Sequence, residues 1–319
     1  FIQWQFKKLH QQNLLVQKPY FATACIVHGP VAVDPSETDI SKGGNAEKQE
    51  YTLLKFKFGD DFLVAATLRP ETMYGQTNLW INPTGSYVRV AVEGENWVMS
   101  QEAADKLKYQ KDDVLLKEDV DPKKLLGRYA LAPFIDNEIP ILPADFCSPS
   151  IGTGIVTSVP GDAPYDYVAL RILQEDIEQC ELFGLDCNDI KDIALIPIVK
   201  SKGYGKFPAQ EIVEKMGIKS LQDKEKLDEA TKELYKVGHH TGVMRENCGK
   251  FAGMKVEEAK ELMKAELLEN GRGDIFHDLS EEVICRCGER VIIKRIDDQW
   301  FIRYSDSTLT EKSKEHVQS

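Results

Sequence analysis

Hydrophobic residues in the first half of the chain occur in short runs separated by turn residues. Residues 51–58 and 62–67 form two such runs around Gly59-Asp60-Asp61, a pattern typical of a β-hairpin. Similar short runs follow at residues 79–81, 87–92, 97–99, 129–133, 138–142 and 154–159. Many short strands with few helices between them favour a β-barrel or rolled sheet over alternating β-α-β units.

The apolar spacing changes to a helical period after residue 162. Beyond this point the pattern predicts helices over 164–176, 208–216, 223–237 and 255–269, and a strand over 193–199. The helix over 223–237 is so rich in charge that we expect it at the periphery. Elsewhere the pattern predicts helices over 1–13 and 101–107, a strand over 21–27, and β-structure again over 282–302. The expected fold class is therefore mixed α and β, with a β-barrel core and surrounding α-helices.

Composition excludes several broad classes of protein. Of 319 residues, 42% are hydrophobic and 29% charged, which is typical of a globular domain. No apolar run approaches the roughly 20 residues of a membrane span, so no membrane association is expected. The net charge of −12 argues against a generally basic nucleic-acid binder but allows a local basic patch. Since the chain begins at Phe1 without a signal pattern, we interpret it as part of a longer protein.

The cysteines indicate reduced thiols. They are seven in number, scattered and without a Cys-x-x-Cys pair, so we expect a cytoplasmic protein. Cys285 and Cys287 are close in sequence, but no histidine follows them at zinc-ligand spacing. His239 and His240 are interpreted as surface or loop residues for the same reason. No metal site is therefore expected.

The first candidate for chemistry is the stretch from Thr67 to Thr77, where an apolar run breaks at Pro70. Two hydroxyls, a guanidinium and a carboxylate are gathered within six residues there. No His or Lys adjoins either threonine to activate it, so attack by a positioned water is easier to defend than a covalent intermediate. A strand-to-helix turn with capping side chains uses the same residue types, and from the residues alone it is the more economical interpretation.

The second candidate is the stretch from Gly152 to Tyr167. Its glycines allow a strand to approach a ligand closely. Asp166 falls in the first turn of the predicted helix, where the dipole favours an ionised carboxylate that can hold a cation such as an α-ammonium group. The alternative is a dipole-stabilising Asp with no ligand. Neither a phosphate-binding loop nor a dinucleotide fingerprint is present in the sequence.

Both stretches resemble motifs of one enzyme family. Residues 67–83 resemble the threonine-rich motif of the editing domain inserted in class I leucyl-, valyl- and isoleucyl-tRNA synthetases, and residues 152–167 resemble its second motif. The isoleucyl branch has Trp where this chain has Glu71, and the valyl branch has Ala-His-Asp where this chain has 161–163. Residues 73–78 and 49–52 resemble the archaeal and eukaryotic cytosolic leucyl-tRNA synthetases.

This resemblance extends over nearly the whole chain and implies a domain organisation. Trp4-Gln5-Phe6 and residues 298–301 resemble the joints to the synthetase's catalytic core. Residues 1–20 are then an entry helix and joint, 21–296 the editing domain, and 297–319 the exit joint. The resemblance is weakest over 175–250, which is interpreted as a lineage-specific insertion.

The resemblance also implies roles for individual residues. Thr67 and Arg69 look like members of the hydrolytic wall, and Asp166 resembles the residue that binds the substrate's α-ammonium group; these three are the candidate catalytic residues. Thr72 resembles the threonine whose bulk excludes leucine. The remaining candidate substrate-binding residues are Leu68, Thr157, Ser158 and Val159. Some family members have Thr where this chain has Leu68, so this chain offers fewer hydroxyls there.

The function implied is hydrolysis of the ester of tRNA(Leu) mischarged with norvaline, isoleucine or methionine, by water. A second pocket is needed because one methylene is worth only about 1–3 kcal/mol in the synthetic site. The implied partners are the 3′ end of tRNA(Leu) and the rest of the synthetase chain, and a monomer is expected. No cofactor is implied for editing, since ATP serves only the absent synthetic domain. The alternatives are a valyl-tRNA synthetase editing domain acting on a threonyl ester, and a non-catalytic module that binds the tRNA acceptor end.

Overall fold

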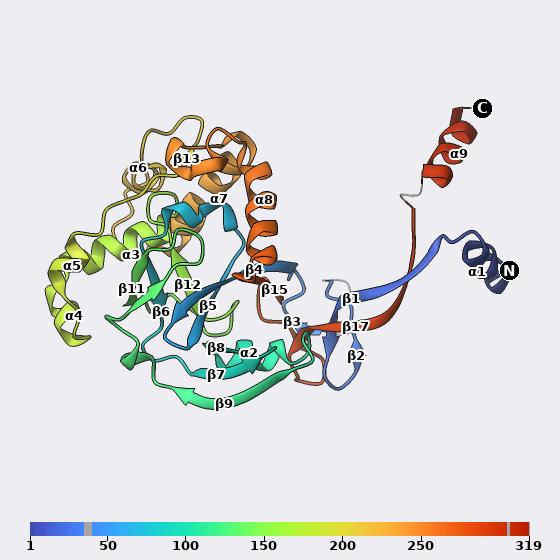
Figure 1. Ribbon diagram of the computed structural model, residues 1–319, viewed down its shortest axis with the longest axis horizontal. Coiled ribbons are helices and arrows are strands. Elements are labelled where there is room, and N and C mark those ends of the chain that lie inside the picture. Colours follow the sequence, from blue (N-terminus) through green and yellow to red (C-terminus); the bar gives the residue numbers. More distant parts are fainter. Residues whose placement is uncertain (35–39, 305–306, 319) are drawn as a thin grey trace. The chain divides into compact units, whose positions relative to one another are not determined.

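The computed structural model describes residues 1–34, 40–304 and 307–318 (Figure 1). The chain divides into two compact units, which are described separately. The terminal unit contains Phe1–Asn45 and Val283–Ser319, and the large unit contains Ala46–Glu282. Among the described residues, no helix is both long enough and apolar enough to cross a membrane.

The terminal unit is built from the two ends of the chain. Its elements are α1 (Ile2–Gln11), β1 (Leu15–Cys25), β2 (Gly29–Pro30), β3 (Ile40–Lys42), β16 (Ile284–Cys285), β17 (Val291–Ile302) and α9 (Ser307–Gln318). β1 pairs antiparallel with β17 along nearly its full length, and β3 pairs with β16. The predicted helix over 1–13 is confirmed. The predicted strand over 21–27 begins earlier, at Leu15, because β17 supplies a partner for these polar residues.

The large unit is centred on a ten-stranded sheet. Its strands are β4 (Lys48–Phe58), β5 (Asp61–Thr67), β6 (Asn78–Ile81), β7 (Tyr87–Val92), β8 (Glu95–Ser100), β9 (Val114–Val120), β10 (Tyr129–Leu131), β11 (Glu138–Pro143), β12 (Ile155–Ser158) and β15 (Gly273–Leu279). The order is β12-β6-β11-β10-β4-β5-β8-β7-β9, and β15 pairs with β4. The expected mixed α and β class and the β4–β5 hairpin are confirmed.

The expected closed barrel is not what the described strands form. β12 and β9 lie at opposite ends of the pairing order and do not pair with each other, so the sheet is open. Strand pairing across the chain is decided by contacts far apart in sequence, which a local alternation pattern does not specify.

Side chains on the two faces of this sheet enter separate apolar clusters. On β4, Leu54 and Phe56 belong to one cluster, whereas Tyr51 and Leu53 belong to the other. Because successive side chains of a strand point to opposite faces, both faces of β4 are buried. Residues 51–56 are accordingly all buried, and these include the polar Thr52 and Lys55.

Helical elements accompany the sheet. They are η1 (Pro70–Gly75), α2 (Gln101–Leu107), η2 (Pro122–Lys124), α3 (Pro164–Glu175), α4 (Ile177–Leu182), α5 (Cys187–Lys191), α6 (Pro208–Lys215), α7 (Lys224–Thr241), η3 (Glu246–Phe251) and α8 (Val256–Glu269). Two-residue strands β13 (Val199–Lys200) and β14 (Val243–Met244) pair beside them. α8 buries the face predicted from its spacing, namely Val256, Ala259, Met263 and Leu267.

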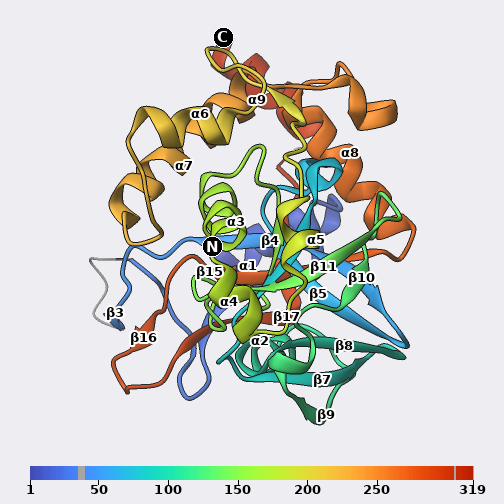
Figure 2. The same ribbon diagram turned by 90° about the vertical axis from the view of Figure 1, so that its left-hand side faces the viewer.

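The helix predicted over 223–237 is mostly exposed, as expected, but it also contributes a buried stripe to the core. α7 buries Leu227, Ala230 and Leu234, which share an apolar cluster with Val168 of α3 and Ile212 of α6. Figure 2 shows these three helices near one another in the large unit. Charged residues occupy the other face of α7, as is usual for an amphipathic helix, so its high charge does not prevent burial of one stripe.

The predicted strand over 193–199 is also mostly wrong, because β13 includes only Val199 and Lys200. The backbone N–H groups of Ile198 and Val199 donate to the Asp162 carboxylate, over 3.0 and 3.4 Å. A side chain thus takes the place of a neighbouring strand, and the apolar residues stay buried without joining a sheet.

Candidate functional site

A cavity of about 880 Å³ lies where two stretches of the large unit meet, β5 with η1 and β12 with α3. The residues that line it are Tyr51, Ala66, Thr67, Leu68, Arg69, Thr72, Asp145, Phe146, Val156, Thr157, Val159, Ala163, Tyr165, Asp166, Leu221, Gln222, Lys224 and Tyr235. This volume is within the range of small-molecule sites, about 300–1,000 Å³. The cavity therefore accommodates a ligand of drug-like or nucleoside size.

The first wall is the turn between β5 and η1. The backbone N–H of Arg69 donates to Thr67 Oγ1 over 3.0 Å, and Thr72 Oγ1 donates to the Arg69 carbonyl oxygen over 2.8 Å. Thr67 therefore keeps a hydroxyl hydrogen that it can donate, whereas the hydroxyl of Thr72 is bound to the backbone. The two threonines cap the turn and line the cavity at the same time, so the capping and the ligand-binding interpretations are compatible.

Arg69 connects this turn to α7 through contacts with Glu71 and Tyr235. Its Nε donates to Glu71 Oε1 over 3.0 Å, and its guanidinium carbon lies 4.1 Å from the centre of the Tyr235 ring. Burial alone would lower the pKa of Arg69, but the negative charge of Glu71, with smaller contributions from Tyr235 and Asp162, raises it overall. Arg69 is thus a fixed cation that joins η1 to α7.

The second wall carries Asp166, in the first turn of α3. Its Oδ2 accepts from the backbone N–H of Val159 over 2.8 Å, and its Oδ1 accepts from Trp80 Nε1 over 3.1 Å. Only 5% of the residue is exposed. Burial raises the pKa of Asp166 to about 7, against the effect of these two donors and the charge of Arg69. An ammonium group placed beside it would favour the ionised form.

Asp162 lies at the start of the same stretch and has a structural role. It is 3% exposed, and its carboxylate accepts from the backbone of the 198–199 segment. Burial raises its pKa to about 6, while the hydrogen bond from Ile198 and the charge of Arg69 act in the opposite direction. Two buried carboxylates thus flank the entry into α3.

The structure brings together most of the predicted site residues. The cavity lining includes Thr67, Leu68, Arg69, Thr72, Thr157, Val159 and Asp166. Ser158 is the exception, and its predicted place in the cavity is wrong. Strand alternation turns Ser158 to the opposite face from Thr157, where it is fully buried and accepts from Thr77 Oγ1 over 3.5 Å.

The glycines that precede β12 allow close packing within the protein. Gly152 has a φ of +56°, and a Cβ there would lie 2.9 Å from the Cβ of Ala66. Gly154 has a φ of +72°, and a Cβ there would lie 2.8 Å from the Cβ of Ser100. Neither glycine is among the residues that line the cavity. Their expected approach to a ligand is thus replaced by an approach to neighbouring strands.

Several lining residues escape sequence reasoning. Tyr235 and Lys224 come from α7, and Leu221 and Gln222 from the turn before it, all within the stretch interpreted as an insertion. Tyr51 comes from β4, Tyr165 from the first turn of α3, and Phe146 from the segment between β11 and β12. Only the amphipathic spacing of α7 could have indicated that this helix packs inward, and spacing does not specify against what.

The polar side chains of the cavity wall limit the chemistry that this site can perform. Among the described residues that line the cavity there is no Ser, Cys or His, the usual members of nucleophile–base pairs. The polar side chains are the carboxylates of Asp145 and Asp166, the cations Arg69 and Lys224, the amide of Gln222, and the hydroxyls of Thr67, Thr72, Thr157, Tyr51, Tyr165 and Tyr235. Thr157 Oγ1 accepts from Gln76 Nε2 over 2.9 Å. The arrangement can anchor a cation at Asp166 and orient an acyl group and a water opposite it.

Comparison with known proteins finds relatives along nearly the whole chain. No protein-family model matches the chain. The chain is 43% identical over 308 residues to a leucine–tRNA ligase of Methanothermobacter thermautotrophicus, with 96% of this chain and 32% of that protein covered. It is 41% identical to the leucine–tRNA ligase of Archaeoglobus fulgidus, with 100% of this chain and 34% of that protein covered. The chain thus spans about a third of the length of these relatives.

Solved structures give the same result for the fold. One described as the crystal structure of GlLeuRS-CP1 is 28% identical, with a TM-score of 0.65 and coverage of 72% of this chain and 99% of that chain. The cytosolic leucyl-tRNA synthetase editing domain of P. falciparum has a TM-score of 0.64 at 21% identity, which shows a shared fold. Sequence and fold together show that the chain belongs to the leucyl-tRNA synthetase family and corresponds to its CP1 editing domain.

Proposed function

We propose that this chain hydrolyses the ester bond of tRNA(Leu) mischarged with norvaline, isoleucine or methionine. The observation that supports it most is the pairing of a buried carboxylate, Asp166, with the threonine-bearing turn on the opposite wall of one cavity. In this proposal the carboxylate binds the α-ammonium of the aminoacyl group and fixes the register of the ester. The partners are the 3′ end of tRNA(Leu) and the rest of a synthetase chain.

The hydrolysis uses water and the chain's own groups. Water adds to the ester carbonyl carbon, the bond to the ribose oxygen breaks, and the proton passes to that oxygen to give a free amino acid and a ribose hydroxyl. Thr67 can donate its hydroxyl hydrogen to the carbonyl oxygen, where negative charge develops. Arg69 positions this turn through Glu71 rather than reacting itself. Positioning of the water and the ester supplies most of the acceleration.

Thr72 supplies the selectivity in this proposal. Because its hydroxyl is bonded to the Arg69 carbonyl, its methyl group is the part of the side chain left to contact a substrate. A fixed methyl at this wall would collide with the γ-branched leucyl side chain and admit the others, which is exclusion by a built-in clash. The names of the relatives favour a leucyl over a valyl editing domain.

The test is deacylation of Ile-tRNA(Leu) compared with Leu-tRNA(Leu), measured with the chain and with the full synthetase. Wild type should hydrolyse the isoleucyl ester and spare the leucyl ester, and Thr72→Ala should hydrolyse both. Asp166→Ala and Asp166→Asn should both abolish turnover while the protein stays folded by circular dichroism. Retained activity in both variants would show that Asp166 does not bind the substrate's α-ammonium group. Binding of the acceptor end without turnover by wild type would instead indicate a non-catalytic module, and preference for a threonyl ester would indicate valyl-type editing.

A further inference from the structure

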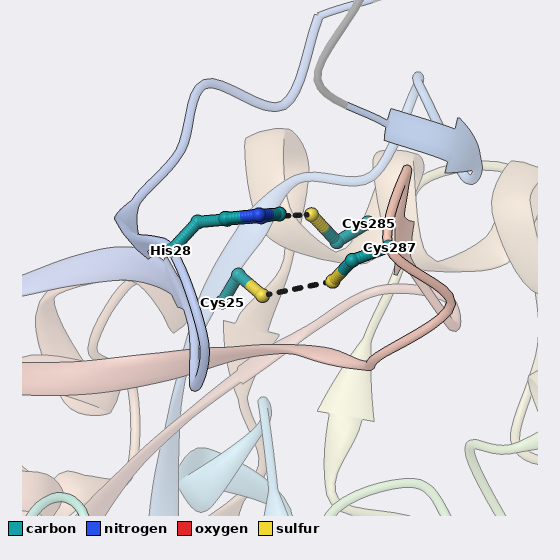
Figure 3. Close-up of side chains that lie close together, drawn as sticks. All are labelled: Cys25, His28, Cys285 and Cys287. Atoms are coloured by element: carbon teal, nitrogen blue, oxygen red, sulfur yellow. Dashed lines mark hydrogen bonds between the residues drawn. The ribbon is translucent and has the colours of Figure 1, made fainter.

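A second cluster of reactive side chains lies in the terminal unit, apart from the residues of the cavity. It consists of Cys25, His28, Cys285 and Cys287, here called the thiol–imidazole cluster. Figure 3 shows the four side chains pointing toward one another from two loops. Their nitrogen and sulfur atoms all lie within 4.8 Å of one another.

Each loop contributes two of these residues from one tight turn. Cys25 ends β1, and His28 precedes Gly29, whose φ is +80° and which pairs with Cys25. Cys285 ends β16, and its backbone N–H donates to the Glu289 carbonyl oxygen over 2.8 Å, while Gly288 N–H donates to the Cys285 carbonyl oxygen over 2.9 Å. Two hydrogen-bonded turns thus hold the four side chains, so the cluster is built by the backbone.

The spacing of the four side chains fits one tetrahedral metal ion. Zinc bonds to sulfur at about 2.3 Å and to nitrogen at about 2.0–2.1 Å, which places adjacent ligand atoms about 3.5–3.8 Å apart in a tetrahedron. Cys25 Sγ lies 3.6 Å from Cys287 Sγ, and His28 Nδ1 lies 3.3 Å from Cys285 Sγ. Both distances are within a few tenths of an ångström of that geometry.

Packing alone does not explain this convergence. Cys25 and Cys285 are buried, as unreactive cysteines often are, but His28 and Cys287 are exposed. Exposed side chains have water as a partner and no need to turn inward.

We propose that Cys25, His28, Cys285 and Cys287 bind one structural zinc ion. Three thiolates and one neutral imidazole are a standard zinc ligand set, and four protein ligands leave no open position for a substrate. Binding releases up to three thiol protons to the buffer, and no electron is transferred. With Nδ1 on the metal, Nε2 of His28 remains free to donate a hydrogen bond to solvent.

The site is invisible to spacing rules applied along the chain. Cys285 and Cys287 have no histidine at ligand spacing, and the expectation of no metal site depended on that. The missing ligands come from a turn far away in the sequence, since Cys25 and Cys287 are 262 positions apart. The metal would close a loop of this length and so join the start and the end of the terminal unit. This inference does not depend on the proposed function.

Zinc content of the purified chain tests the proposal. The chain should be prepared with a thiol reductant, dialysed, and analysed by mass spectrometry of the metal, and after chelation it should be titrated with zinc alone. We expect one zinc per chain, proton release on binding, and a Tm that falls when a chelator removes the ion. Cobalt in place of zinc should give the charge-transfer absorption of thiolate ligands, which decreases with each cysteine removed.

His28→Ala and Cys287→Ser are the informative variants, because both side chains are exposed and their replacement leaves the core unchanged. Each should weaken zinc binding by more than about 100-fold, since loss of even an outer partner costs about 10–100-fold. Cys187→Ser, a half-exposed cysteine outside the cluster, is the matched control and should bind like wild type. Absence of zinc binding by the reduced wild type, wild-type affinity in both cluster variants, or a Cys25–Cys287 disulfide in the isolated protein would each overturn the proposal.

Discussion

The indole Nε1 of Trp80, on β6, donates to Asp166 Oδ1 over 3.1 Å and thereby links the sheet to the first turn of α3. Trp80 is fully buried and its ring lies edge-on to Phe146, which lines the cavity. The position of the carboxylate, the proposed anchor for the substrate's ammonium group, is therefore set by a core residue of the sheet. Effects on the anchor should follow from changes in the core behind it.

Trp80→Phe should weaken both stability and the anchor. It leaves Asp166 Oδ1 without its donor, which costs about 1–3 kcal/mol in the free energy of unfolding, measured in urea. With one donor fewer, the pKa of Asp166 rises further, so the acid limb of deacylation should move to higher pH. Trp97→Phe is the control, since Trp97 is equally buried and donates to Glu95 away from the cavity. A shift of the acid limb in both variants, or in neither, would contradict the link.

Stability should fall as pH rises from about 4 to about 7. The folded-state pKa values of Asp166, about 7, and Asp162, about 6, lie above that of an unfolded Asp, about 3.9, so the folded state binds more protons in this window. The free energy of unfolding therefore decreases with pH there, by a few kcal/mol at most. Asp166→Asn cannot ionise and should show a shallower slope in urea unfolding across this range, whereas exposed Asp60→Asn should follow wild type. Identical slopes for all three proteins would refute the assignment.

Arg69→Ala should be strongly destabilising, because it leaves Glu71 buried at 3% exposure without its cation. Breaking one partner of such a pair costs about 3–5 kcal/mol. The double variant Arg69→Ala with Glu71→Gln should recover part of this loss in a urea double-mutant cycle. Lys108→Ala removes an exposed pair with Asp105 and should cost less than about 1 kcal/mol. Simple additivity of the two single changes would mean that Arg69 and Glu71 are not coupled.

Thr72 offers two matched replacements that separate its methyl from its hydroxyl. Thr72→Ser keeps the bond to the Arg69 carbonyl and loses the methyl, so it should hydrolyse Leu-tRNA(Leu). Thr72→Val keeps the bulk and should continue to spare leucine; the Arg69 carbonyl retains the backbone N–H of Thr72, so the stability loss should be about 0.5–1.5 kcal/mol. Deacylation rates of both esters decide between the groups. The opposite outcome would assign the exclusion to the hydroxyl.

Local patterns predicted the local elements. The turn at Gly59 defined the β4–β5 hairpin, and the spacing of Val256, Ala259, Met263 and Leu267 defined the buried face of α8. The orientation of Ser158 was also within reach, because alternation along β12 separates it from Thr157. Most of the site residues came from the resemblance rather than from physical chemistry, since a capped turn has the same composition.

What the sequence did not contain is pairing over long distances. The strand order of the sheet, the contact of Tyr235 with Arg69, and the meeting of Cys25 with Cys287 all depend on residues far apart in the chain. Each depends on which surfaces the folded chain brings together. Asp162 illustrates the same limit. Its carboxylate accepts hydrogen bonds from the backbone N–H groups of Ile198 and Val199, in a segment whose apolar sequence predicts a strand.

The pairing of β4 with β15 places Lys48 opposite Leu279, so the large unit begins and ends on adjacent strands of its own sheet. In the terminal unit, β3 and β16 likewise bring Lys42 opposite Ile284. In each unit, the two points at which the chain passes to the other unit therefore lie beside paired strands. The large unit can therefore be treated as a separable insert. Because its ends are adjacent, we expect that a short linker between them would allow circular permutation. For the same reason, another insert with adjacent ends should fit between the two halves of the terminal unit.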